Sequence, residues 1–193
     1  MASRKYLGII IASIALTLGA PDASAFDDGF SSAKKIESKY ITAYYPSDTD
    51  PAGLVQALNM RAADKIMAGG APGSKKSCEE ELAEALDTLF IQVSDILEMH
   101  LYSLKTAVKI CRDDAQLTDI YTRMFNANLG GRRSFYVYDL ATIYISKDSF
   151  KREILGHEMS HAIISNYFVI PTPIKIQEVL SMYVEYNLRR AAQ

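Results

Sequence analysis

Two of the three histidines in the chain stand four residues apart, in the segment "EILGHEMSHAIISNYF" of residues 153–168. An α-helix advances 3.6 residues per turn, so His157 and His161 share one face and their imidazoles can bind the same cation. Zn²⁺ suits such a pair because it accepts neutral imidazole nitrogen and leaves a position for water. Glu158 lies about 100° round the helix from His157, within reach of that water. The spacing therefore predicts two zinc ligands and a general base, Glu158, on a single turn.

An ordinary buried helix is the alternative interpretation of this segment. Ile154, Leu155, Met159, Ala162 and Ile163 are enough to make such a helix apolar. Two histidines and a glutamate would then need partners, because unpaired polar groups in a protein interior are costly. A metal ion would supply those partners, which favours the zinc interpretation.

Catalytic zinc sites usually have three protein ligands, so a third must come from elsewhere in the chain. The pattern H-E-x-x-H-x-x-G-x-x-H is excluded, because Ile164 and Tyr167 stand where it requires Gly and His. His100 lies far upstream, where we expect a capping or surface role. We predict Glu178 as the third ligand, because it lies near the start of the last expected helix, close to the connection that returns from the histidines. Glu185, two turns later on the same face, is the rival.

The elements that must position these residues mix helices and strands without regular alternation, which predicts an α+β fold. Strands are expected at 39–46, at 104–110 and within 134–146, the last broken near Asp139. Helices are expected from Pro51, capped by Asp50, to about 66, and at 79–98, 113–125, about 148–165 with Asp148 as cap, and 174–190. Residues 26–39 are expected to be a loosely held lead-in, and 69–77 a flexible loop.

Length and composition indicate one globular domain, residues 26–193, after a leader of 25 residues. Hydrophobic residues make up 49% of the chain, and its formal net charge is -2. Lysines and arginines are scattered, so a nucleic-acid partner is not expected.

The first 25 residues have the layout of a secretory signal peptide. Arg4 and Lys5 precede an apolar run from 6 to 20, and Ala23-Ser24-Ala25 offers a cleavage site before Phe26. The run is short for a bilayer span, which needs about 20 residues, although a retained anchor is the alternative. We therefore expect a secreted or periplasmic protein without stable membrane association after cleavage. In that oxidising setting Cys78 and Cys111 are expected to form a disulfide, since no C-x-x-C pattern supports a zinc role for them.

The segments "ILGHEMSHAIISNYF" and "IQEVLSMYVEYNL" resemble the active-site pair of helices in the gluzincins, the thermolysin-like zinc metallopeptidases. The resemblance implies a zincin-like fold, a small mixed β-sheet packed on helices, with zinc held by His157, His161 and Glu178. It also implies peptide-bond hydrolysis of a peptide or protein substrate, with Glu158 as the base. The family binds extended substrate along an edge strand, for which "SFYVYD" (134–139) is the candidate; an ordinary strand is the alternative.

Larger gluzincins have a further domain that supplies a tyrosine or histidine to stabilise the oxyanion, and in this chain the donor must come from elsewhere or be absent. The candidates are Tyr136, Tyr138, Tyr167, Tyr183 and Tyr186. Two other functions stay open. A zinc-stabilised binding module would keep the fold and metal without turnover, whereas a metal-free domain would lose no stability to a chelator.

Overall fold

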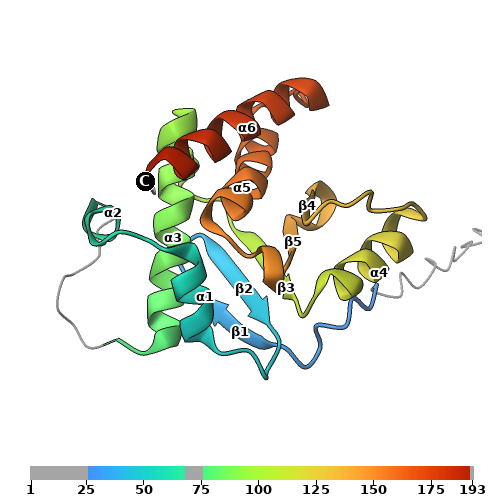
Figure 1. Cartoon of the computed structure of the whole chain (residues 1–193). Helices are drawn as coiled ribbons and strands as arrows, with labels where there is room; N and C mark the ends of the chain where they lie inside the picture. The colour runs from blue at the N-terminus through green and yellow to red at the C-terminus, as the bar shows by residue number, and fades with distance from the viewer. Residues whose placement is uncertain (1–25, 68–75, 192–193) are drawn as a thin grey trace, which may run out of the picture.

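The computed structural model describes residues 26–67 and 76–191 of the chain (Figure 1). The expected signal peptide lies outside these residues, as does most of the expected flexible loop. Within the described ranges, no helix combines the length and the apolar character needed to cross a membrane.

The described residues form an α+β fold around one mixed, five-stranded sheet. Its strands lie in the order β1-β2-β3-β5-β4. The pairs β2–β3 and β3–β5 are parallel, whereas β1–β2 and β4–β5 are antiparallel. The sheet therefore has antiparallel strands at both edges. The bounds are β1 Lys34–Glu37, β2 Ile41–Tyr45, β3 Thr106–Cys111, β4 Ser134–Val137 and β5 Thr142–Ser146.

Six α-helices and two 3₁₀ turns connect and cover the strands in the described part of the chain. The α-helices are α1 Pro51–Leu58, α2 Ala62–Met67, α3 Cys78–Leu97, α4 Asp114–Phe125, α5 Arg152–Tyr167 and α6 Ile174–Ala191. The 3₁₀ turns are η1 Tyr138–Leu140, between β4 and β5, and η2 Lys147–Ser149, before α5. The predicted interruption of the 134–146 segment near Asp139 is therefore confirmed.

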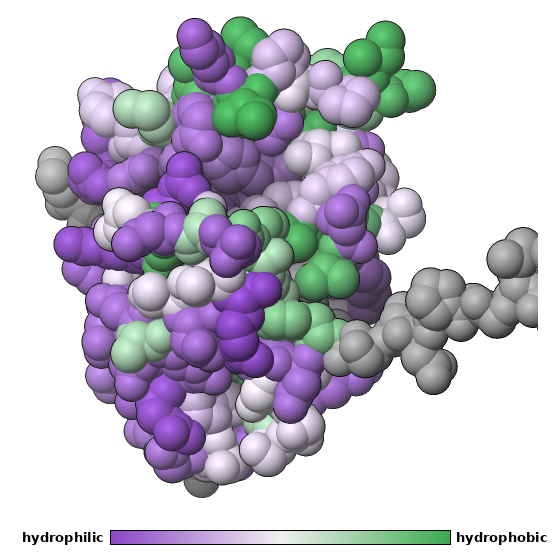
Figure 2. All heavy atoms as spheres, turned by 90° about the vertical axis from the view of Figure 1, so that its right-hand side faces the viewer, coloured by the Kyte–Doolittle hydropathy of each residue, from purple (hydrophilic) through white to green (hydrophobic). Residues whose placement is uncertain are grey.

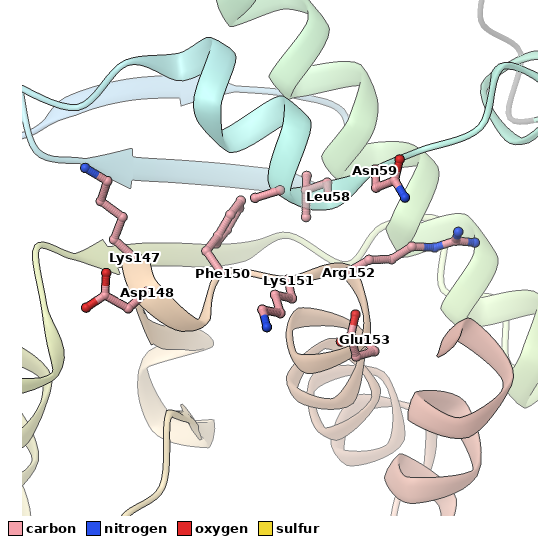
Figure 3. Close-up of a pocket in the computed structure, with 9 residues that line it drawn as sticks. Leu58, Asn59, Lys147, Asp148, Phe150, Lys151, Arg152 and Glu153 are labelled. Atoms are coloured by element: carbon pink, nitrogen blue, oxygen red, sulfur yellow. The ribbon is translucent and has the colours of Figure 1, made fainter. Parts of the chain in front are cut away.

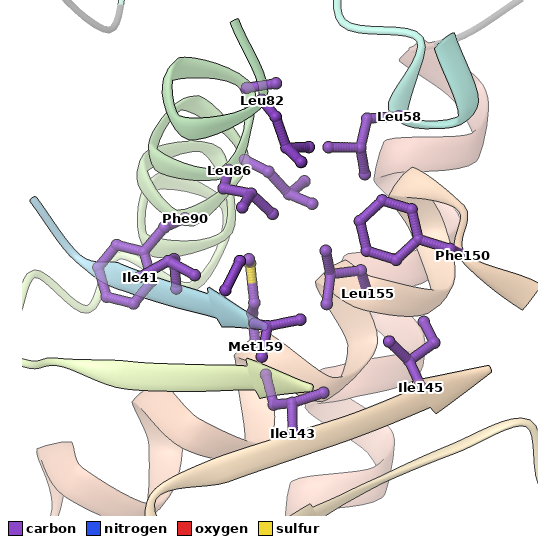
Figure 4. Close-up of a cluster of buried hydrophobic side chains, with 14 of the residues drawn as sticks. Ile41, Leu58, Leu82, Leu86, Phe90, Ile143, Ile145, Phe150, Leu155 and Met159 are labelled. Atoms are coloured by element: carbon purple, nitrogen blue, oxygen red, sulfur yellow. The ribbon is translucent and has the colours of Figure 1, made fainter. Parts of the chain in front are cut away.

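Helices cover the two faces of the sheet unequally, and the larger core lies under α1, α3 and α5 (Figures 1 and 4). Strand residues alternate between faces, so Ile143 and Ile145 of β5 point into this core, where Met159 and Leu155 of α5 meet Leu86 of α3. Tyr144 points to the opposite face, where α4 and the N-terminal segment form a smaller core. Helix α5 is thus held by buried side chains against both α3 and the sheet.

Three predicted features of the fold are wrong. Residues 34–37 are not part of a loose lead-in but form the edge strand β1, paired with β2. The helix expected from Pro51 to about 66 stops at Leu58, because Asn59 adopts a left-handed backbone (φ 44°) that caps α1 before α2 begins. Asp148 does not cap α5, since it lies in η2 and Lys151 is the capping position.

The expected disulfide is also wrong, because Cys78 and Cys111 are both free thiols. Cys111 follows Ile110 in β3 and therefore points to the other face of the sheet, into the small core against α4. Cys78 is exposed at the start of α3, on the side of the larger core. Burial raises the pKa of the Cys111 thiol to about 12, so this sulfur is protonated and unreactive at neutral pH.

Candidate metal centre

The two histidines of the H-E-x-x-H motif face each other on α5, as their spacing predicts. The distance from His157 Nε2 to His161 Nε2 is 3.3 Å. Glu178 in the first half of α6 joins them: its carboxylate oxygens lie 3.6 Å from His157 Nε2 and 3.7 Å from His161 Nε2. One donor atom from each of the three residues lies within 4.8 Å of the others. The structure thus brings together His157, His161 and Glu178.

These donors fit a zinc ion by spacing and by chemistry. Two ligands on a tetrahedral zinc, each bound at about 2.0–2.2 Å, are separated by roughly 3.3–3.6 Å. The 3.3 Å between the two Nε2 atoms lies in that range, and Glu178 approaches His157 with Oε2 at 3.6 Å and His161 with Oε1 at 3.7 Å. Zinc also requires neutral imidazole, and burial together with the neighbouring His157 lowers the pKa of His161. The set of two imidazoles and one carboxylate leaves room for a fourth ligand.

The rival carboxylate, Glu185, lies on the other side of the first histidine. Its Oε2 is 3.3 Å from Nδ1 of His157, although the buried Nδ1 makes no well-aligned hydrogen bond. Its Oε1 accepts a hydrogen bond from Arg189 at 2.6 Å. Glu185 therefore faces the nitrogen that points away from His161 and Glu178. A carboxylate in that position fixes the orientation of a metal-binding imidazole rather than binding the metal itself.

The second histidine has an amide in the corresponding position. Gln177 Oε1 lies 3.4 Å from Nδ1 of His161, and its Nε2 donates to the backbone oxygen of Thr172 at 2.8 Å. The amide oxygen can accept the Nδ1 proton of His161, which leaves Nε2 free to bind a cation. Gln177 was not predicted from the sequence. Its position next to Glu178 in the sequence does not indicate a contact with His161, because that contact exists only when α6 packs against α5.

The predicted base, Glu158, is almost completely buried and is held by the edge strand of the sheet. Its Oε1 accepts a hydrogen bond of 2.7 Å from the hydroxyl of Ser134, the first residue of β4. Burial raises the pKa of Glu158 above the ordinary value, and the Ser134 hydrogen bond opposes that rise only in part. A carboxyl group with a raised pKa is better matched to proton transfer near neutral pH. Sequence reasoning missed Ser134, because only the tertiary fold brings β4 to α5.

A cleft of about 1050 Å³ opens beside these residues, between β4, α5 and α6. Side chains in β4 alternate, so Ser134 and Tyr136 both face α5, and Asn166 lies 3.5 Å from the Tyr136 hydroxyl. Among the described residues that line the cleft, two are tyrosines, Tyr136 and Tyr138. Tyr183 and Tyr186 are instead exposed on α6, and Tyr167 packs its ring against Phe168. The candidate oxyanion donors that line the cleft are therefore Tyr136 and Tyr138.

The strand β4 forms the wall of this cleft and pairs only with β5 among the described strands. It is thus an edge strand, as predicted for "SFYVYD", although the strand itself ends at Val137 and the following residues form η1.

The start of α5 is fixed by the buried Arg152. Its Nη2 donates to Gln92 Oε1 of α3 at 2.9 Å and lies 3.6 Å from Oδ2 of Asp64 in α2. Arg152 also lines a second, smaller hollow of about 320 Å³, together with Lys147 and Asp148 (Figure 3). The residues lining that hollow include both basic and acidic side chains, and these do not point toward one common position. Arg152 therefore anchors the helix that carries the histidines.

His100, the third histidine, lies outside the centre. It is exposed after the end of α3, and its Nδ1 is 3.7 Å from Asp95. This agrees with the surface role expected for it. Comparisons with known proteins add no assignment: the chain matches no protein-family model, no curated protein and no solved structure.

Proposed function

We propose that the protein is an exported zinc-dependent peptidase with a compact, zincin-like fold. The observation that carries the proposal is the convergence of His157 Nε2, His161 Nε2 and the Glu178 carboxylate beside the buried carboxyl of Glu158. A purely structural zinc site has four protein ligands and no use for a base. Here three ligands face an open cleft, and the fourth position is left for water or substrate.

The residues have separate roles in the proposed reaction. His157, His161 and Glu178 would hold the metal, and Glu185 and Gln177 orient the two imidazoles. A bound zinc ion supplies a lowered water pKa, near 7, and polarises the scissile carbonyl. Glu158 takes the proton of the attacking water and passes it to the leaving amine. Ser134 keeps the Glu158 carboxyl in place.

The substrate in this proposal is an extended peptide. The open edge of β4 lies along the cleft, and its main-chain groups can pair with an added strand. The cleft is large enough for several side chains, since ligand pockets for small molecules span about 300–1,000 Å³. Tyr136 stands on β4 beside the proposed path of the peptide and is our candidate to stabilise the oxyanion.

The test combines metal analysis with cleavage of a peptide library. We expect one equivalent of zinc and cleavage in the wild type. Glu158→Gln should keep zinc but lose cleavage, whereas Glu178→Ala should lose both. Glu153→Gln is the matched control, because Glu153 lines the same cleft without joining the donor cluster.

Two outcomes would refute the peptidase. Zinc bound at one equivalent without cleavage of any peptide would identify a binding module. No bound zinc, together with a melting temperature that a chelator leaves unchanged, would identify a metal-free domain.

A further inference from the structure

Helix α6 carries a row of exposed apolar side chains on the side that faces away from the rest of the protein. Ser181, Val184 and Leu188 are buried towards the body of the molecule. Ile176, Val179, Met182, Tyr183 and Tyr186 are all between 50% and 64% exposed. At 100° per residue these five positions cluster about half a turn from the buried three. A surface helix normally carries polar residues there, and a helix that is apolar on both sides is normally covered on both sides.

The connection that leads into α6 extends this apolar surface. Val169 is fully exposed, Ile170 is 80% exposed and Ile174, the first residue of α6, is 76% exposed. Apolar colour gathers at the top of the face in Figure 2, over the α5–α6 connection and the beginning of α6. Val169 and Ile174 also line the cleft. We therefore call only Ile170 and the five residues of the helix row the α6 surface.

The α6 surface is large compared with what a monomeric protein exposes. Its six residues present on the order of 700 Å², taking about 150–250 Å² for a fully exposed large side chain. The largest apolar patch on a typical monomer is about 300–600 Å². One side of a standard protein–protein interface covers about 800 Å². The α6 surface therefore comes close to the area of one side of a standard interface.

The composition of the α6 surface favours a protein partner over a lipid bilayer. Tyrosine, methionine and arginine are enriched in protein interfaces. The helix row contains Tyr183, Tyr186 and Met182, and Arg190 lies over the Tyr186 ring at 5.6 Å. Helices that lie in a bilayer surface use Trp, Phe and Leu, with a polar face rich in lysine turned to water. The face of α6 opposite to the row is instead buried against protein.

From area and composition together, we propose that the α6 surface is the interface of a homodimer. A second copy is the partner because two-fold dimers are the commonest assembly and need only one self-complementary patch. The two α6 helices run antiparallel across the two-fold axis, which opposes their dipoles and keeps the basic ends, Arg189 and Arg190, apart. Met182, near the middle of the row, lies close to the axis. The proposal is independent of the zinc site.

Sedimentation velocity on the purified chain tests the dimer. We expect a dimer at micromolar concentration, and at least a hundredfold weaker association for Met182→Glu and Val179→Asp. Phe125→Glu is the matched control: Phe125 is a similarly exposed apolar residue on α4, which packs on the other face of the sheet, and its substitution should leave the dimer intact. Circular dichroism of each variant separates dissociation from unfolding.

A cysteine placed near the axis gives a second test that does not depend on destabilising the surface. In a Cys78→Ser background, Met182→Cys should form an intermolecular disulfide on mild oxidation, since each residue near a two-fold axis meets its own copy. A monomer at every concentration would overturn the proposal, and so would a dimer that both α6 substitutions leave intact. A monomer that binds lipid vesicles would show that the surface meets a membrane instead.

Discussion

Gly156, directly before the first histidine, lets α6 approach α5 closely, and Gly156→Ala tests whether this contact positions the centre. A Cβ atom at position 156 would lie 2.2 Å from Cδ1 of Leu188 and 3.5 Å from Cγ2 of Val93. Carbon atoms in contact are normally about 3.5–4.0 Å apart, so Leu188 would have to retreat by more than 1 Å. Leu188 is only 2% exposed and cannot swing into solvent. The substitution therefore forces α6 outward or puts Leu188 in a poor rotamer.

Two opposing effects decide the stability of Gly156→Ala. Alanine is better than glycine inside a helix by about 1 kcal/mol, whereas overpacking a core costs about 1–3 kcal/mol. Because the clash is severe, we expect a net loss of about 1–2 kcal/mol in the free energy of unfolding, measured by urea denaturation of the metal-free protein. Zinc affinity should fall by about 10–100-fold, because Glu185, one turn before Leu188, loses its contact with His157.

The double variant Gly156→Ala/Leu188→Ala is the control for this reasoning. Leu188→Ala alone should cost about 2–5 kcal/mol through the cavity it leaves. The new methyl group would fill part of that cavity, so the double variant should be at least 1 kcal/mol more stable than the sum of the two single effects. If Gly156→Ala instead raised stability by the helix-propensity gain and left zinc affinity unchanged, α6 would not be held through this contact.

Three further substitutions test the cleft and the smaller core. Ser134→Ala should lower kcat/KM by about tenfold, as expected for the loss of one hydrogen bond to a charged group. It should also raise the pKa of Glu158 further, so the acid limb of the pH–rate profile should move to higher pH. Tyr136→Phe should lower kcat by about 10²-fold while zinc stays bound, and an unchanged kcat would rule out its oxyanion role. Asp28→Asn should cost about 2–3 kcal/mol in thermal unfolding experiments, because it leaves the partly buried Lys109 without its counter-charge. Burial alone would raise the pKa of Asp28, but the hydrogen bonds from Lys109 and Tyr144 outweigh this effect and lower the pKa. The ionised carboxylate therefore stabilises the fold above pH about 4. The difference in unfolding free energy between wild type and Asp28→Asn should become smaller as the pH falls below that value.

Local signals in the sequence were sufficient to predict which residues of the two helices meet at the candidate metal centre. The spacing of His157 and His161 placed both on one face of a helix, and the connection after them let Glu178 return to the same place. The structure brings these three residues together as expected. Each of these inferences used contacts between residues near one another in the chain.

The features that sequence reasoning missed depend on distant partners. The strand β1 reads "KKIE" and buries only Ile36, so it shows no alternation, and its pairing with β2 decides its conformation. Ser134 and Glu158 meet because β4 is the edge strand next to α5. Cys111 is separated from Cys78 because its side chain points to the face of β3 opposite to the larger core that α3 covers, and the direction of that side chain depends on the pairing of the whole sheet.

All three candidate ligands belong to one uninterrupted stretch of chain, from His157 to Glu178. Closing such a short loop costs little chain entropy, and the cost grows only slowly with added residues. The helical hairpin could therefore capture a cation before the sheet has assembled, and the metal would then favour the correct packing of α6 on α5. Insertions in the connection at 168–173 should weaken metal binding less than any change in the angle between α5 and α6.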